Sequence, residues 1–245
     1  MPPEEVYLDN SATTSISPQV LQEMGKISAE EYGNPSALHH RGSKAERILN
    51  SSRQLLAELL GVQSREIIFT SGGTEANNLA ILGLARRHRK NGNHLITSSI
   101  EHSSVLEPCR QLEKEGFDVT FVDPDSKGKI SPEALAEAVT PRTILVSIMH
   151  VNNEVGTVQP LADISKAVKN KKTALIFHAD AVQSFTKLPL IPAEQGIDAL
   201  SLSAHKFHGP KGAGALYLRD GLLIEPLLLG GGQERNLRSG TENIP

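Results

Sequence analysis

The sequence predicts an α/β protein of three layers, in which helices cover both faces of a mostly parallel, mixed β-sheet. The first observation behind this prediction is that short apolar runs, typical of strands, alternate with longer segments whose apolar residues recur at helical spacing. The second is that residues 143–149 are almost continuously apolar, as expected for a parallel strand buried on both faces. A chain of 245 residues is long enough for one large domain of this kind.

The predicted elements begin with two helices. Ser17 and Pro18 predict the start of the first, because a capping serine followed by proline suits a first helical turn. A longer helix is expected from Ser43 to Leu60, and Gly61 is expected to end it. The expected buried face of this helix consists of Ala45, Ile48, Leu49, Leu55, Leu56, Leu59 and Leu60.

Strands and helices then alternate along the rest of the chain. Strands are expected at residues 67–69, 94–97, 119–122, 143–149, 174–177 and 199–202, and helices at 74–89, at 103–115, from 132 and at 160–169. Residues 214–218 follow the preceding strand too closely for a helical crossover, so we expect them to pair antiparallel.

The composition excludes several classes of protein. Lys and Arg number 25 against 28 Asp and Glu, and this near-balance gives no reason to expect a nucleic-acid or membrane partner. No stretch approaches the roughly 18 consecutive apolar residues of a membrane span, and the first residues lack the pattern of a secretory signal. Cys109 is the only cysteine, which excludes an internal disulfide and a paired-cysteine metal site, and no metal site is expected. A cytoplasmic protein is the simplest interpretation.

Five loops that leave predicted strands carry polar side chains able to bind a ligand or to transfer protons. These loops are Thr70–Glu75, Ile100–His102, His150–Glu154, His178–Gln183 and Ser203–Lys206. Because ligands bind at the carboxyl ends of the strands in open parallel sheets, we expect these loops to meet at one site.

Each of these motifs alone has a plainer explanation. The Ser71–Thr74 turn offers backbone N–H groups and the Thr74 hydroxyl to an anion, but it could equally be a simple strand-to-helix turn. Asp180 ends a buried strand and needs a cation or strong donor there, unless it only caps a helix. Lys206 is either a partly desolvated, reactive amine or an ordinary solvated lysine, and His102 is either catalytic or a core residue.

Taken together, the motifs suggest one ligand. An anion cradle, a buried carboxylate and a lysine on separate loops are what pyridoxal phosphate requires. The carboxylate keeps the pyridine nitrogen of this cofactor protonated, and the amine binds its aldehyde.

The motifs also resemble those of a known family. They resemble, in order and over nearly the whole chain, cysteine desulfurases of the group that includes the nitrogen-fixation and housekeeping iron–sulfur enzymes. The motifs that carry the resemblance are Tyr7–Thr14, Tyr32–Ser36, Phe69–Glu75, Glu101-His102, Val151–Gly156, His178–Gln183, Ser201–Lys206 and Arg238–Glu242.

The resemblance implies a fold and a domain organisation. The fold is that of the large domain of pyridoxal-phosphate-dependent transferases of fold type I, which includes the class-V aminotransferases. Residues 16–245 would form this cofactor-binding domain, incomplete at its C-terminal end. Residues 1–15 would pack with a C-terminal small domain that is absent from the sequence.

The resemblance further implies a role for each site residue. Lys206 would form the Schiff base to pyridoxal 5'-phosphate and later move the substrate Cα proton. Asp180 would pair with the pyridine nitrogen, and His102 would stack on the ring and take part in acid–base steps. The remaining cofactor contacts implied are Asn153 and Gln183 to the phenolic oxygen, and Gly73, Thr74, Ser203, His205 and, from a second subunit, Thr241 at the phosphate. The last of these makes a homodimer part of the site.

The implied reaction removes sulfur from L-cysteine, releases L-alanine and leaves a persulfide on an enzyme cysteine. This sulfur would serve iron–sulfur cluster assembly and tRNA thiolation through scaffold and acceptor proteins. In the family the reactive cysteine lies beyond the position that matches Pro245. Cys109 lies between apolar helix residues and is expected in the core. These 245 residues are therefore expected to bind the cofactor without transferring sulfur.

Two kinds of alternative stay open at this point. Within the same fold, a selenocysteine lyase, a cysteine sulfinate desulfinase or another class-V enzyme shares the lysine, aspartate and phosphate sites. In a different class, the chain is a non-catalytic sulfur-assembly scaffold or never binds the cofactor.

Overall fold

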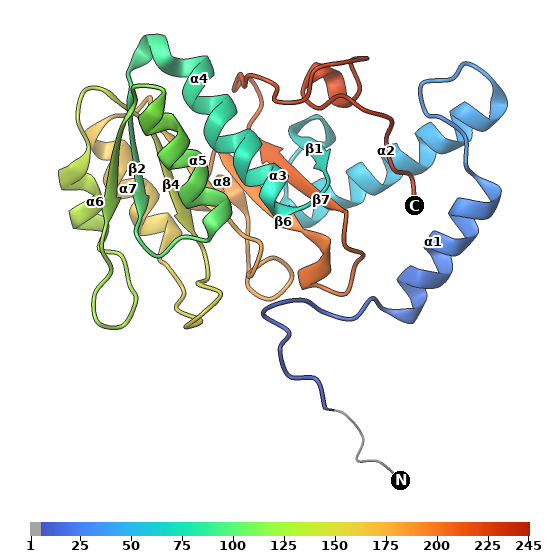
Figure 1. Cartoon of the computed structure of the whole chain (residues 1–245), viewed down its shortest axis with the longest axis horizontal. Helices are drawn as coiled ribbons and strands as arrows, with labels where there is room; N and C mark the ends of the chain where they lie inside the picture. The colour runs from blue at the N-terminus through green and yellow to red at the C-terminus, as the bar shows by residue number, and fades with distance from the viewer. Residues whose placement is uncertain (1–5) are drawn as a thin grey trace.

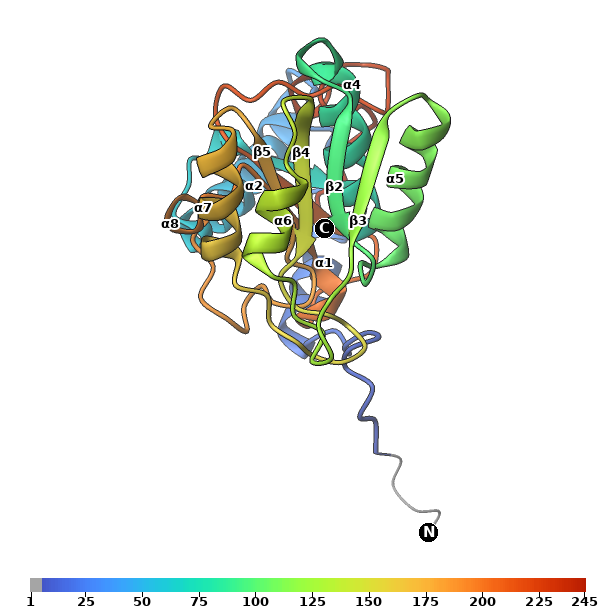
Figure 2. The ribbon, with the colours of Figure 1, turned by 90° about the vertical axis from the view of Figure 1, so that its left-hand side faces the viewer.

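The computed structural model describes residues 6–245, which form a seven-stranded sheet with helices on both faces (Figures 1 and 2). Residues 1–5, part of the segment 1–15 expected to pack with a small domain, lie outside the described residues. Across the sheet the strands are ordered β1 (Ile67–Thr70), β7 (Gly214–Leu218), β6 (Ala199–Ser203), β5 (Ile176–Asp180), β4 (Thr143–Met149), β2 (His94–Ser98) and β3 (Asp118–Val122). Strand β7 pairs antiparallel with both neighbours and the other pairs are parallel, which confirms the mostly parallel mixed sheet.

Each face of the sheet has its own apolar core. Buried residues of α2 (His40–Leu60), α6 (Pro132–Ala138) and α7 (Leu161–Lys171) form one core, and the short α8 (Pro192–Gln195) packs beside α7. Those of α3 (Gly73–Asn78), α4 (Leu84–His88) and α5 (Ser103–Lys114) form the other core on the opposite face. This arrangement confirms the predicted three layers (Figure 2). Helix α1 (Pro18–Glu30) stands outside them and buries none of its residues.

Helices α3 and α4 are parts of one continuous helix. A π-helical turn, Leu79–Gly83, joins them, and the residues at both junctions keep right-handed helical dihedral angles. The helix predicted at 74–89 is therefore confirmed as a whole. Gly83 is required where it lies, because a Cβ there would come within 2.6 Å of Ile224 Cγ1 and of the Glu225 carbonyl oxygen.

The boundaries and the buried face of α2 differ from the prediction. The helix begins at His40 rather than Ser43, because His39 caps it by accepting a hydrogen bond from the Gly42 N–H. The prediction that Leu55 and Leu59 are buried is wrong, since they are 59% and 57% exposed. Successive helical residues are about 100° apart, so only the stripe that includes Ala57 and Leu60 faces the sheet.

Two further differences concern the strand and helix that follow α7. Strand β5 begins at Ile176 and ends at Asp180, two to three residues later than the predicted range 174–177. The short helix α8 was not expected, and it is opened by Pro192 and closed by Gly196 in the left-handed conformation.

A polar chain crosses the interior of the sheet. The imidazole of His178 on β5 is fully buried, and its Nδ1 lies 2.8 Å from Ser147 Oγ on β4. Its Nε2 lies 2.9 Å from Ser201 Oγ on β6. Burial lowers the pKa of His178 to about 3, so the ring is neutral and both of its nitrogens have hydroxyl partners.

The C-terminal segment, residues 219–245, folds back onto β1 and α2 (Figure 1). Glu234 is buried and accepts two hydrogen bonds from Arg53, at 2.6 and 2.8 Å, and one from the Phe69 N–H, at 3.0 Å. The side chains of Arg53 and Glu234 are 11% and 2% exposed. This pair therefore anchors a segment that has no regular strand or long helix.

None of the helices in the described part of the chain combines the length and hydropathy of a bilayer-spanning segment.

The Arg53–Glu234 pair should be important for stability. Glu234→Gln removes the charge that compensates Arg53, and breaking a buried pair in this way costs about 3–5 kcal/mol. We expect urea unfolding to show a loss of this size. Asp220→Asn is the control, because it breaks the exposed pair with Arg65 and should leave the unfolding midpoint unchanged. A Glu234→Gln variant as stable as wild type would show that the Arg53–Glu234 pair is not important for stability.

Candidate active site

A cavity of about 900 Å³ lies at the carboxyl ends of the strands. Loops that follow β1, β2, β4, β5 and β6 line it, together with the N-terminal residues Asp9 to Thr13. The structure brings together here every predicted site residue except Thr241, namely Gly73, Thr74, His102, Asn153, Asp180, Gln183, Ser203, His205 and Lys206. Thr241 is exposed and does not line the cavity of its own chain.

Asp180 is the last residue of β5, and its carboxylate is buried in the cavity wall, where it is 6% exposed. Oδ1 accepts a hydrogen bond of 2.9 Å from the Val182 N–H, and Oδ2 one of 2.7 Å from Asn77 Nδ2. Burial raises the pKa of Asp180, although these donors and the nearby His102 and Lys206 oppose the rise. No helix begins here, so the carboxylate caps a turn rather than a helix.

Asn77 is a site residue that sequence reasoning missed. Its Nδ2 donates to Ser104 Oγ at 2.9 Å as well as to Asp180, and its buried Oδ1 has no partner among residues 6–245. The available signal was its spacing, because Asn77 is one helical turn after Gly73 and Thr74 and shares their face.

The turn between β1 and α3 forms a cradle for an anion. Within residues 6–245, the N–H groups of Gly73 and Thr74 donate to no protein acceptor. They start a helix that continues to His88, so its positive dipole end points at the cradle. A Cβ at position 73 would lie 2.6 Å from Val182 Cγ2, so a residue larger than glycine would require the Val182 side chain to move. These features suit an anion, and binding of an anion at this turn stays a prediction.

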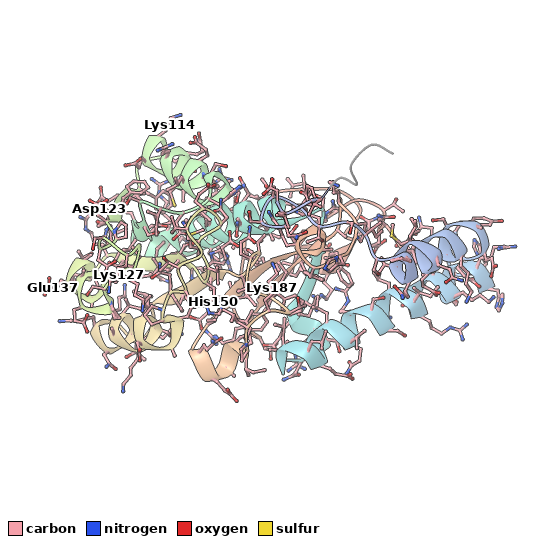
Figure 3. All side chains as sticks on the ribbon, turned by 90° about the horizontal axis from the view of Figure 1, so that it is seen from below. Lys114, Asp123, Lys127, Glu137, His150 and Lys187 are labelled. Carbon is pink, nitrogen blue, oxygen red and sulfur yellow. The ribbon has the colours of Figure 1, made fainter. Side chains whose placement is uncertain are left out.

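Lys206 lies in the loop after β6 and is half-buried. Its Nζ donates to the carbonyl oxygens of Ser11 and, at 2.8 Å, Ala12. Burial, and then the ammonium of Lys187, lower the pKa of Lys206, so the lysine is not an ordinary solvated one. Lys187 lies near the middle of the molecule when it is seen from below (Figure 3).

Two histidines border the cavity. His102 caps α5, and its Nδ1 accepts the Ser104 N–H at 3.1 Å, so the proton of the neutral ring is on Nε2. The alternative that His102 is a core residue is wrong, because the side chain is exposed to the cavity. His205 Nδ1 lies 3.1 Å from Thr13 Oγ1. Burial, and then the charges of Lys206 and Lys211, lower the pKa of His205.

Asn153 and Gln183 line the cavity, and each amide NH2 group makes one hydrogen bond in this structure and has a second N–H. Asn153 Nδ2 donates to Glu154 Oε1 at 2.6 Å, and Gln183 Nε2 donates to the Ser11 carbonyl at 2.8 Å. Their contact with a cofactor oxygen stays a prediction.

The N-terminal segment also belongs to the site, and sequence reasoning gave it no part there. The N–H and hydroxyl of Thr14 both donate to the His205 carbonyl, at 2.8 and 2.9 Å, and the Ser17 N–H donates to that of His208. Residues 11–17 thus hold the lysine loop. Packing of residues 1–15 with a small domain stays a prediction.

Cys109 lies within α5 and is 1% exposed, which confirms that it is a core residue. Burial raises the pKa of its thiol to about 12. A buried, protonated thiol is a poor nucleophile.

Comparison with known proteins gives a consistent result. The family described as Aminotransferase class-V matches residues 6–245. The chain is 49% identical to cysteine desulfurase IscS of Dictyoglomus turgidum and 48% identical to that of Methanosarcina thermophila, each over 240 residues. These matches cover 98% of this chain but 60% and 59% of the relatives, so the chain spans about 60% of the length of these proteins.

Solved structures are similar over the same region. A NifS-like protein has a TM-score of 0.96 and 45% identity, and the match covers 98% of this chain and 66% of that one. The structure of SspA in complex with cysteine has a TM-score of 0.94 and 46% identity, with 98% and 69% covered.

Glu101, next to His102, gives a pH-dependent prediction. Its Oε1 accepts from Ser98 Oγ at 2.5 Å and from the Met149 N–H at 3.1 Å, and its buried Oε2 has no partner among residues 6–245. Burial raises the pKa of Glu101 from 4.5 to about 8. Between these values the folded state binds more protons than the unfolded state, so this group's contribution to stability falls as pH rises.

Glu101→Gln removes this titration. Relative to wild type, its free energy of unfolding should therefore increase by about 4 kcal/mol between pH 5 and pH 9, measured by urea titration. Glu137→Gln is the control, because Glu137 is exposed on α6, far from the cavity (Figure 3). The same pH profile for Glu101→Gln and wild type would show that Glu101 ionises as easily as an exposed glutamate.

Proposed function

Because this chain belongs to the class-V aminotransferase family, we propose that it is the cofactor-binding part of a cysteine desulfurase, which converts L-cysteine to L-alanine. The observation that carries the proposal is that a lysine, a buried carboxylate and a glycine cradle line one cavity. Similar proteins are named cysteine desulfurases, and one similar structure is a complex with cysteine.

The residues of the cavity fit pyridoxal 5'-phosphate, the cofactor of this family. Asp180 is buried without a Lys or Arg at ion-pair distance among residues 6–245, and a protonated ring nitrogen would supply the missing positive partner. The free N–H groups of Gly73 and Thr74 suit a phosphate. When bound, the cofactor supplies an electron-withdrawing ring that stabilises negative charge on the substrate Cα.

Residues that line the cavity would transfer or hold protons at the substrate Cα and at the cofactor ring. Lys206 takes the proton from the substrate Cα, and its lowered pKa favours the neutral amine that this step needs. Asp180 holds a proton on the ring nitrogen, and Asn77 fixes the orientation of its carboxylate. His102, with its proton on Nε2, would lie against the ring and would serve as an acid or base.

The other residues bind and orient the cofactor. Gly73, Thr74, Ser203 and His205 would hold the phosphate, with the Nδ1 of His205 kept in place by its contact with Thr13 Oγ1. Asn153 and Gln183 would donate to the phenolic oxygen, since each amide NH2 group has a second N–H besides the one that is bonded here.

A second copy of the chain completes the site in this proposal. Thr241 contacts the phosphate of the neighbouring subunit, which agrees with its exposure and its distance from its own cavity. The protein acts as a homodimer in the cytoplasm and passes sulfur to iron–sulfur scaffold and acceptor proteins, including those of tRNA thiolation. Residues 16–245 form the large domain, and residues 1–15 also contact a small domain.

Covalent attachment at Lys206 tests the proposal. The chain mixed with pyridoxal 5'-phosphate should become yellow, and borohydride should then fix the cofactor irreversibly to Lys206, as seen by peptide mass spectrometry. Lys206→Ala should abolish both signals. Lys187→Ala, a change at an exposed lysine nearby, should keep them. A colourless wild-type chain, or equal labelling of the two variants, would refute the assignment.

Sulfur transfer should not occur on Cys109. Because its thiol is buried and its pKa is raised to about 12, we expect no alanine release above background from the 245-residue chain with L-cysteine. Cys109→Ser should behave as wild type in the same assay. Persulfide detected on Cys109 by alkylation and mass spectrometry would contradict this expectation.

A further inference from the structure

An ion pair connects the anion cradle with the C-terminal segment. Glu75 is the third residue of α3 and lines the cavity. Its Oε2 accepts the Ser71 N–H at 2.8 Å, and its Oε1 accepts Arg238 Nε at the same distance. A second guanidinium nitrogen, Arg238 Nη2, lies 3.3 Å from Oε2. The two side chains are only 17% and 23% exposed, so water screens the pair weakly.

Glu75 changes the cradle in two ways. It uses the Ser71 N–H, so this donor is not available to a bound anion, and the N–H groups of Gly73 and Thr74 are the ones left. It also places a negative charge beside an anion site, which disfavours binding unless a cation compensates it. Burial would raise the pKa of Glu75, but the hydrogen bonds from Arg238 and Ser71 more than compensate and lower it, so the group is ionised.

Arg238 supplies the compensating charge from outside the cavity. It does not line the cavity, so it acts on a bound anion through Glu75 rather than by contact. Contacts of the neighbouring residues fix the chain that carries Arg238. Four residues earlier, Glu234 is bound to Arg53 and to the N–H of Phe69, which lies on β1, the strand that leads into the cradle. Arg235 also donates to the carbonyl oxygens of Arg65 and Ile67 on this side of the sheet.

We propose that Arg238 is a positioning residue for anion binding, which holds Glu75 against Ser71, neutralises its charge and so sets the affinity of the cradle for a phosphate group. That the phosphate belongs to pyridoxal 5'-phosphate rests on the proposed function. The competing explanation is that Arg238 only ties down the C-terminal segment, in which case the charge of Glu75 would not matter.

A double-mutant cycle with charge-neutralising variants separates these explanations. Arg238→Gln leaves the Glu75 carboxylate uncompensated, and we expect about tenfold weaker binding of pyridoxal 5'-phosphate at low ionic strength, with a smaller loss in high salt. Pyridoxal, which lacks the phosphate, should bind as it does to wild type. The double variant Glu75→Gln with Arg238→Gln should regain most of the affinity, and Arg238→Lys should keep most of it. Fluorescence titration measures each dissociation constant.

The matched control is Arg86→Gln. It breaks the pair between Arg86 and Glu115, which has a similar exposure of 30% and 26% but lies away from the cavity. It should leave the affinity unchanged. Thermal melting of every variant verifies that the fold persists.

Three results would overturn the inference. They are an unchanged affinity in Arg238→Gln, an equal loss in the single and double variants, and an equal loss for pyridoxal. Inorganic phosphate, assayed by its protection against thermal unfolding, keeps the test independent of the proposed function. If phosphate follows the variant pattern while pyridoxal 5'-phosphate does not bind wild type, the proposed function fails and this inference stands.

Discussion

The need to satisfy a carboxylate buried at the end of a central strand organises this end of the molecule. Asp180 terminates β5, in the middle of the sheet, where an unpaired charge is costly. Its two oxygens accept hydrogen bonds from the Val182 N–H of its own loop and from Asn77 Nδ2 of α3. Because Asn77 also bonds Ser104 at the start of α5, this one requirement fixes the mutual position of β5, α3 and α5. Asp180, Asn77 and Ser104 all line the cavity, so the same requirement fixes one of its walls.

Much of the fold could be predicted because its signals are local. The apolar strand at 143–149, the closing glycine at position 61 and the serine–proline start of α1 all depend on neighbouring residues only. Errors arose where tertiary packing decides the result. The apolar stripe of α2 is wider than the face that meets the sheet, so the pattern alone could not show that Leu55 and Leu59 stay exposed. The late start of β5 and the short α8 likewise depend on packing.

The site was predictable where residues lie on strand-end loops, since sheet topology brings such loops together. Lys206, Asp180 and the Gly73 turn line one cavity for this reason. Contacts between distant segments carried no local signal. Neither the ion pair that Glu75 makes with Arg238, 163 positions away, nor the contact of Lys206 with residues 11 and 12 could be deduced from spacing. Polar contacts of this kind depend on the folded path of both segments.

The contact between Lys206 and the N-terminal segment has a consequence for mutagenesis. The amine is bound by the main-chain oxygens of Ser11 and Ala12, and no side chain of that segment takes part in the bond. Replacing the side chain at position 11 or 12 therefore leaves the hydrogen-bond acceptor of Lys206 in place, because the peptide oxygen remains. A change of backbone path, such as a deletion or an inserted residue, would remove the carbonyl oxygens from Lys206 Nζ.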